Sequence, residues 1–240
     1  MIKLFRKIRQ NLLSDGKTGK YINYAIGEII LVVVGILIAL QINNWNNNNQ
    51  LEKLESKYLM EIGNNLKSDL PDINFNIDFN ESRLKSNEIV LLYLNREIDY
   101  SDSLKFHFGN LIFSTRTLPN TSTYENLKSR GLEIITNDAL RQMITTLYSF
   151  SYHNVIDFEK QDDHPFQYGV LFPEVMKAFN IHTVWKNAEP IDRQKLRDNY
   201  QLKNAITTNI LIRKHILSYY TELKKSVENC INEISIELEK

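Results

Sequence analysis

The residues best suited to chemistry lie in one short stretch of the chain. His153 and Asp157 are four residues apart, so on a helix they would share a face and could act as metal ligands. Three more ionisable residues follow: Asp162, Asp163 and His164. No His-Glu-x-x-His pattern and no cysteine cluster accompanies them. We therefore expect a solvated polar helix end here, with no metal and no cofactor.

Other catalytic signatures are missing from the sequence. It contains no glycine-rich phosphate loop and no Gly-x-Ser-x-Gly motif, and the remaining histidines are isolated. Aromatic residues are dense between positions 148 and 172, where they could line a pocket, although helical spacing favours a role in the core. They are Tyr148, Phe150, Tyr152, Phe166, Tyr168 and Phe172. We predict that the protein is not an enzyme.

The longest apolar stretch of the sequence lies near its start. Residues 24–45 read YAIGEIILVVVGILIALQINNW, and residues 29–40 carry no polar side chain. With its flanks the stretch reaches the roughly 20 residues that a helix needs to cross a bilayer. It is longer than the core of a signal peptide, and no small-x-small cleavage site follows it. We predict an uncleaved signal anchor, with a transmembrane helix over residues 21–45.

Charge predicts the orientation of this helix. Residues 1–20 carry an excess of basic residues, whereas charges beyond residue 45 are mixed. The positive-inside rule then places the N-terminus in the cytoplasm and residues 46–240 in the periplasm. Residues 1–20 also have an amphipathic pattern, typical of a segment on the lipid surface, although a frayed basic tail is the alternative. The net charge of zero gives no indication of a nucleic-acid partner.

Glu28 is an ionisable residue within the predicted span, where charge is costly and often functional. Small residues at helical spacing allow two helices to approach closely. We therefore predict a helix interface formed by Gly27, Glu28, Gly35 and Ala39, used for self-association or for docking to a partner membrane protein. The alternative is an interfacial glutamate without a partner. Tyr21, Tyr24 and Trp45 are predicted to anchor the span at the two interfaces.

The remainder of the sequence is predicted to be helical throughout, so the fold class is all-α. We expect a stalk helix over residues 50–69, ended by Pro71, and then helices over 72–97 and 101–113, the latter capped by Ser101. A short helix follows, with Ser122 in a capping box and Gly131 just after its end. Asn137 is expected to cap a helix over 138–160 that residues 161–165 end. Beyond it we expect a helix over 166–179 interrupted near Pro173, and an irregular loop over 180–190.

The last helix is predicted from about residue 202 almost to the C-terminus. Apolar residues recur along it at alternating steps of four and three: Ile216, Tyr220, Leu223, Val227, Cys230 and Ile234. We expect this seam to pack against one long partner helix, and residues 50–69 are the natural candidate. The prediction is an up-down helical bundle that the C-terminal helix closes, with Cys230 as a core residue.

Three segments of the chain carry a family resemblance: IKLFRKIRQNLLS, the span YAIGEIILVVVGILIALQINNW, and TYENLKSRGLEIITNDALR. They resemble a large family of uncharacterised single-pass inner-membrane proteins of Gram-negative bacteria, classed as a domain of unknown function. The resemblance is close over the first 45 residues and looser beyond. It implies an inner-membrane location, an exported helical domain and no known activity. Arg130 departs from the usual serine before the glycine, and residues 46–49 lack the usual acidic residue.

Three functional hypotheses follow from these observations. The first is a non-enzymatic, membrane-anchored scaffold or interaction subunit that associates with itself or with a partner membrane protein in the lipid bilayer. The second is a ligand-sensing periplasmic bundle that passes a signal through its membrane helix to another protein. An enzyme is the third and least supported, because no catalytic constellation is recognisable.

Overall fold

The computed structural model describes residues 18–240, apart from the side chains of Thr18, Lys20 and Tyr21. The predicted amphipathic segment therefore lies mostly outside the described residues. Within them the fold is predominantly helical, as predicted, and it divides into two compact units, Met1–Leu54 and Glu55–Lys240.

The described part of the first unit is helical and belongs to α2, Thr18–Leu94. Its apolar stretch is long enough to cross a membrane. No residue in the most apolar part of this stretch is buried. A helix whose whole circumference is apolar and exposed is typical of a segment surrounded by lipid.

Pro71 does not end a helix, contrary to the prediction, because α2 continues through it to Leu94. Proline removes one backbone hydrogen bond of a helix. Pro71 and Lys67, the residue whose carbonyl group loses its partner, are both exposed, while Leu66 and Ile73 are buried. Packing on both sides of Pro71 thus preserves the helix.

In the second unit, α2 presents one continuous buried seam. Most of its buried residues alternate at steps of four and three, which keeps them on one side of the helix. They are Glu55, Leu59, Ile62, Leu66, Asp69, Ile73, Asn76, Asn80, Arg83, Asn87, Val90 and Leu94. From Asp69 to Asn87 the seam is mostly polar, and the residues on either side of this stretch are apolar except for Glu55.

After α2 come α3, Leu104–Gly109, and α4, Ser122–Arg130, which is followed by a 3-10 turn at Leu132–Ile134. The helix predicted to reach residue 113 ends at Gly109, and neither Ser101 nor Ser122 caps a helix. Ser103 and Thr121 occupy the cap positions, and neither side chain makes a capping hydrogen bond. Gly131 follows α4 directly at φ +122°, as a glycine after a helix end does.

A helical run then extends from Asp138 to Ala178. It comprises α5 (Asp138–Thr146), η2 (Leu147–Ser151), α6 (Tyr152–Phe158), η3 (Glu159–Asp163), α7 (His164–Phe166), η4 (Gln167–Leu171) and α8 (Phe172–Ala178), of which the η segments are π-helical. Asn137 caps α5 as predicted, accepting from the backbone N–H groups of Ala139 and Leu140. The predicted end at 161–165 and the interruption near Pro173 are wrong. Pro165 and Pro173 each lie in the first two residues of an α-helical piece after a π turn, where a missing N–H is tolerated.

Residues 180–190, predicted as an irregular loop, form most of an antiparallel hairpin. Strands β1 (Phe179–Thr183) and β2 (Asn187–Pro190) pair from Phe179 with Pro190 to Thr183 with Asn187. The hairpin is too short and polar for its alternation to stand out in the sequence. A short helix follows, α9 (Arg193–Leu196), which Asp192 caps.

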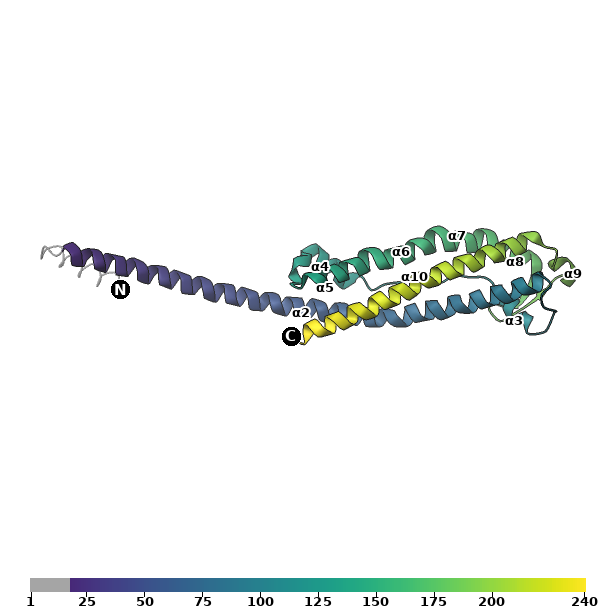
Figure 1. Ribbon diagram of the computed structural model, residues 1–240, viewed down its shortest axis with the longest axis horizontal. Helices are drawn as coiled ribbons and strands as arrows, with labels where there is room; N and C mark the ends of the chain where they lie inside the picture. Colours follow the sequence, from purple (N-terminus) through teal and green to yellow (C-terminus); the bar gives the residue numbers. More distant parts are fainter. Residues whose placement is uncertain (1–17) are drawn as a thin grey trace. The chain divides into compact units, whose positions relative to one another are not determined.

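The C-terminal helix α10, Tyr200–Leu238, is close to its predicted extent, and all six predicted seam residues are buried. Gly63 of α2 lies so close to α10 that a Cβ there would be 3.4 Å from Ile234 Cγ2. Further along, Asn80 and Asn87 of α2 contact Arg213 and Asn209 of α10, so the two helices are antiparallel. Figure 1 shows α10 alongside α2 and the run from α5 to α8.

The run from α5 to α8 is also antiparallel to α10, because Asn137 bonds Glu237 at one end and α8 contacts the start of α10 at the other. It therefore runs in the same direction as α2, and the chain must return along the bundle between them. Residues 110–121 make this return without regular secondary structure. From Leu111 to Asn120 an extended chain spans about 30 Å, whereas a helix would span about 13 Å. Since the matching length of α2, from Asp69 to Asn87, is about 27 Å, the return segment has to be extended.

Candidate functional site

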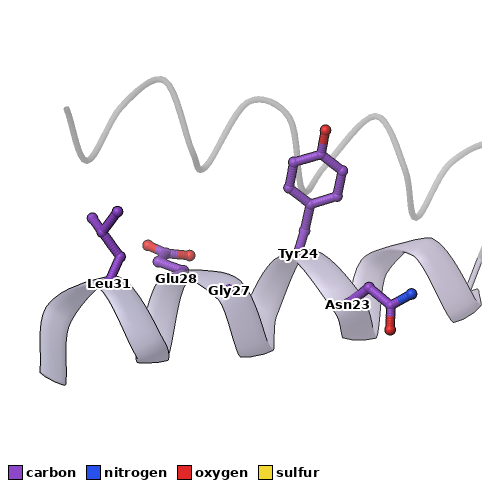
Figure 2. Close-up of a pocket in the computed structure, with 5 residues that line it drawn as sticks. All are labelled: Asn23, Tyr24, Gly27, Glu28 and Leu31. Atoms are coloured by element: carbon purple, nitrogen blue, oxygen red, sulfur yellow. The ribbon is translucent and has the colours of Figure 1, made fainter. Parts of the chain in front are cut away.

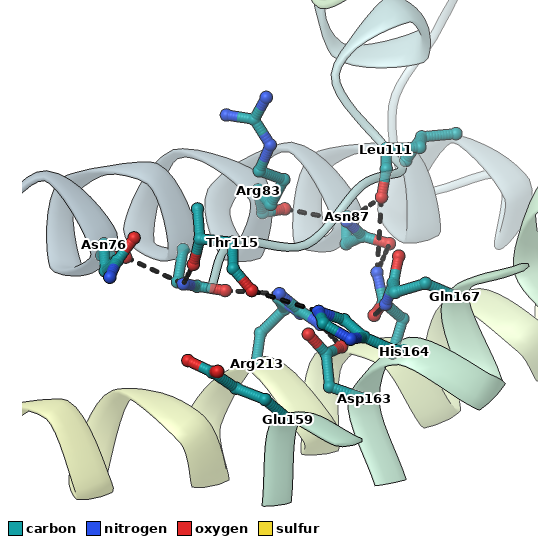
Figure 3. Close-up of polar contacts among 12 residues, drawn as sticks. Asn76, Arg83, Asn87, Leu111, Thr115, Glu159, Asp163, His164, Gln167 and Arg213 are labelled. Carbon is teal, nitrogen blue, oxygen red and sulfur yellow. Dashed lines mark hydrogen bonds and ion pairs between the residues drawn. The ribbon is translucent and has the colours of Figure 1, made fainter. Parts of the chain in front are cut away.

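The middle of the bundle contains a polar cluster instead of an apolar core (Figure 3). Its members come from α2, from the π-helical part of the run, and from α10. They are Asn76, Asn80, Arg83 and Asn87; Glu159, Asp163 and Gln167; and Asn209 and Arg213, all 5% exposed or less. We call this set the polar core.

The first task of the polar core is to bind the extended return segment, whose backbone groups lack a helical or sheet partner. Asn87 Nδ2 donates to Leu111 O at 3.1 Å, and Asn76 Nδ2 donates to Arg116 O at 3.5 Å. His164 Nε2 lies 3.1 Å from Thr115 O. Side chains of the helices thus provide hydrogen-bond partners for backbone carbonyl groups of the return segment, which has to be extended to match the length of the bundle.

Glu159 is the clearest example of this role. Its carboxylate accepts from Thr117 N at 3.0 Å and from Thr117 Oγ1 at 2.7 Å, and it also accepts from the Tyr220 hydroxyl. Burial raises the pKa of Tyr220, and the neighbouring Glu159 raises it further, so the phenol remains a donor. Glu159 therefore ties the return segment to α10.

Arg213 and Asp163 form an ion pair in which both side chains are 0% exposed. Burial lowers the pKa of Arg213 to about 9, which still leaves it protonated at neutral pH. A buried guanidinium needs a counter-charge, and Asp163 supplies it. Arg213 also donates to Asn80 Oδ1, so the pair joins all three long helical elements.

An amide chain continues the polar core. Gln167 Nε2 donates to Asn209 Oδ1 at 2.5 Å, and Asn209 Nδ2 donates to Asn87 Oδ1 at 3.0 Å. Between residues 155 and 175 the same side of the helical run stays buried, because buried side chains recur every four residues. They are Val155, Glu159, Asp163, Gln167, Leu171 and Val175. In an α-helix each such step would rotate about 40° too far. The wider π turns η3 and η4 remove this drift.

Two further buried carboxylates of α2 bind connecting segments of the chain, nearer to the first residue of the second unit. Asp69 accepts from Asn120 N at 3.2 Å and from the Tyr152 hydroxyl at 2.7 Å. Glu55 accepts from Thr136 N at 2.7 Å. Both are seam positions of α2, so the same pattern recurs along the helix.

The cluster of ionisable residues singled out in the sequence is divided by the structure. His153 and Asp157 form an exposed pair with 3.0 Å between Nε2 and Oδ2, and Asp162 is exposed too. The expectation of a solvated helix end is wrong for Asp163, which is buried, and for His164, which contacts the return segment. Within residues 18–240 no group of three or more His, Cys, Asp and Glu side chains is placed to hold a metal ion.

The aromatic residues between 148 and 172 are likewise divided. Tyr148 and Tyr152 are buried, while Phe150 and Tyr168 are 62% and 52% exposed. The prediction that they are core residues is therefore correct only for part of the set.

The predicted membrane interface lies on the exposed helix of the first unit. Figure 2 shows Tyr24, Glu28 and Leu31 on one side of α2, where they line a hollow of about 290 Å³ with Asn23 and Gly27. Helical geometry continues this stripe to Gly35 and Ala39. A Cβ added at Gly27 or Gly35 would meet no described atom within 4 Å. Of the predicted anchors, Tyr24 and Trp45 are 54% and 66% exposed, and the side chain of Tyr21 is outside the description.

The polar core was not predicted, although the sequence of α2 contains a signal for it. Asp69, Asn76, Asn80, Arg83 and Asn87 fall on the same alternation of three and four as the apolar seam of α2. Polar residues at such positions indicate specific contacts inside a bundle. On α10 the seam also begins earlier than predicted, at Leu202 and Ile206, and Asn209 and Arg213 follow at the same spacing.

The comparisons with known proteins identify a family without a known activity. Residues 28–187 match the model of a family described as "Family of unknown function (DUF6090)". No curated protein and no solved structure matches the chain. The matched region begins at Glu28 and includes the polar part of the α2 seam and the run from α5 to α8.

Proposed function

Because this chain belongs to the family of unknown function DUF6090, its own residues must indicate its role, and we propose that it is a non-enzymatic, membrane-anchored interaction protein. The observation that carries the proposal is the apolar stretch of α2, none of which is buried. Such a surface is stable only in lipid or against another apolar surface.

The basic residues before the span favour an N-terminus in the cytoplasm and a helical domain in the periplasm, hence a single-pass inner-membrane protein. Fusions at residue 240 test this orientation. An alkaline phosphatase fusion should be active and a green fluorescent protein fusion dark. The opposite pair of results would refute the proposed topology.

The stripe of Gly27, Glu28, Gly35 and Ala39 supports association through the membrane helix. Small residues let two helix backbones approach, and a glutamate between helices can bond to a partner. The chain would associate with a second copy of itself or dock to a partner span. The second unit contributes a helical bundle whose buried polar side chains fix how its elements align, which suits a scaffold.

Disulfide crosslinking in membranes tests this interface. In a Cys230→Ala background, Gly35→Cys and Ala39→Cys should give dimers, whereas Leu37→Cys, on the opposite side of the helix, should not. Equal crosslinking at all three positions would mean random collision. No crosslinking at any position, together with no co-purifying membrane protein, would refute the interface.

A second candidate function is ligand binding by the helical domain. It is favoured by one buried arginine of the polar core that has no counter-charge.

A further inference from the structure

Arg83 and Arg213 are both buried, but only one of them is paired. Arg213 contacts Asp163, whereas no carboxylate among residues 18–240 lies within 4.0 Å of Arg83, which is 5% exposed. Figure 3 shows the Arg83 guanidinium directed away from the Asp163 and Arg213 side chains. The other carboxylate of the polar core, Glu159, is already hydrogen-bonded by Thr117 and Tyr220.

Aromatic rings take the place of a counter-charge at Arg83. The guanidinium carbon lies 3.2 Å from the centroid of the Phe79 ring and 5.6 Å from that of Trp185. Nη1 donates only to Phe79 O, at a long 3.4 Å, and the enclosed Nε has no partner among the described residues. Burial lowers the pKa of Arg83 to about 10, so it remains charged at neutral pH. A cation–π contact offsets part of the cost of burying a charge but leaves hydrogen-bond donors unused.

The indole that lies over Arg83 and a phenylalanine ring packed against that indole both belong to residues with a left-handed backbone. Trp185 in the hairpin turn has φ +68° and Phe113 in the return segment has φ +88°, and their rings meet edge to face at 5.8 Å. Trp185 N donates to Gly109 O at 3.0 Å, which fixes the turn against the end of α3. Non-glycine residues in the left-handed region are costly, and they concentrate at functional sites.

Unpaired polar atoms adjoin both strained residues. Ser114 Oγ, next to Phe113, and Asn187 Oδ1, two residues after Trp185, are buried without a partner in the described part of the chain. Buried polar groups are nearly always satisfied, so a concentration of exceptions calls for a reason. Two buried polar atoms without a described partner thus lie close in sequence to the two residues with a left-handed backbone.

We propose that Arg83, with Phe79 and Trp185, binds the carboxylate of a small organic acid that has a flat, apolar body. A guanidinium offers parallel N–H donors that match the two oxygens of a carboxylate. The aromatic side chains provide surfaces on which an apolar body stacks. This inference is independent of association through the membrane helix, because it concerns only the second unit.

Trp185 gives the proposal a direct readout. The indole is 48% exposed while Arg83 is almost fully covered, so a ligand would have to approach the guanidinium past the indole. The chain has two tryptophans, and Trp45→Phe leaves Trp185 as the only one. Titration of this full-length protein in detergent with sodium benzoate should change Trp185 fluorescence saturably. Benzamide has the same shape without the charge, so it should not, and neither should sodium chloride at equal ionic strength.

Substitution of Arg83 separates binding at this site from binding elsewhere. Arg83→Met should lower benzoate affinity about tenfold or more, since a hydrogen-bonded charge contributes that much. Arg83→Lys, which keeps the charge without the paired donors, should fall between. Arg193→Met is the matched control, because Arg193 also lies over a ring, 3.7 Å from the centroid of Tyr100, yet outside this cluster.

The proposal fails if benzoate causes no saturable change, if benzamide binds equally well, or if Arg83→Met leaves the affinity unchanged. Circular dichroism establishes that each variant is folded. We expect Arg83→Met to melt at the temperature of the parent protein or above, because it removes a buried charge that lacks a partner. Should Arg83→Met not fold, the Arg83→Lys titration decides, and an unchanged benzoate affinity there would overturn the proposal.

Discussion

Arg213 on α10 and Asp163 on η3 form an ion pair that excludes solvent completely, with both side chains 0% exposed. The pair lies where α2, the helical run and α10 meet, and Asn80 of α2 accepts a further hydrogen bond from Arg213. Buried pairs of this kind add little net stability, yet breaking one is costly, because the remaining charge is left unpaired. The pair therefore specifies how the three elements align.

We first predict that Asp163→Ala destabilises the protein by about 3–5 kcal/mol, because it leaves the Arg213 guanidinium buried and unpaired. The double variant Asp163→Leu with Arg213→Met should recover much of this loss. Chemical denaturation of the full chain in detergent, followed by circular dichroism, measures both. A loss below about 1 kcal/mol for Asp163→Ala would contradict a buried charge pair.

Second, Tyr220→Phe should lower the free energy of unfolding by about 1–3 kcal/mol, since the buried Glu159 carboxylate loses a donor. Tyr219→Phe is the matched control: its residue is neighbouring and partly exposed, and its ring packs on Phe158 and His215. The control should change stability by less than about 0.5 kcal/mol. Equal effects would show that ring packing, not the hydroxyl, matters at position 220.

Third, Pro71→Ala should stabilise the protein, by up to about 3 kcal/mol, because alanine restores a backbone hydrogen bond inside α2. Pro71 is exposed, so the substitution removes no core contact. Thermal unfolding followed at the helical circular dichroism band measures the change. Destabilisation would instead mean that α2 requires a bend at this position.

Fourth, stability should fall as pH drops below about 6.5, in part through His107. Burial lowers the pKa of His107, and the nearby Lys85 lowers it further, while Ser86 Oγ lies 3.1 Å from its Nδ1. The unfolded chain therefore takes up a proton first as pH falls, and unfolding is favoured until the folded pKa is passed. Above pH 6.5 both states are neutral and the effect vanishes.

Comparison of His107→Gln with the parent protein isolates this contribution. The difference in melting temperature between pH 7.5 and pH 5 should be smaller in the variant. His153→Gln, at an exposed position, should match the parent. An identical pH dependence in all three proteins would exclude His107 as a source.

The sequence alone determined the apolar span, the helical class and the seam of the C-terminal helix. These depend on local periodicity, which side chains such as Ile216, Leu223 and Val227 display whatever lies opposite them. The cap at Asn137 was predictable for the same reason, because its hydrogen bonds reach only two and three residues ahead.

Only the tertiary structure decided the rest. Pro71 lies within a helix because packing on both sides outweighs one lost hydrogen bond, and residues 110–121 are extended because a helix of that length could not return along the bundle. Asp163 is a core residue because Arg213, distant in the sequence, is opposite it. The same applies to Arg83, whose aromatic cover comes from Trp185 in a hairpin far along the chain. Such contacts depend on which elements meet in space, and local sequence patterns do not encode that.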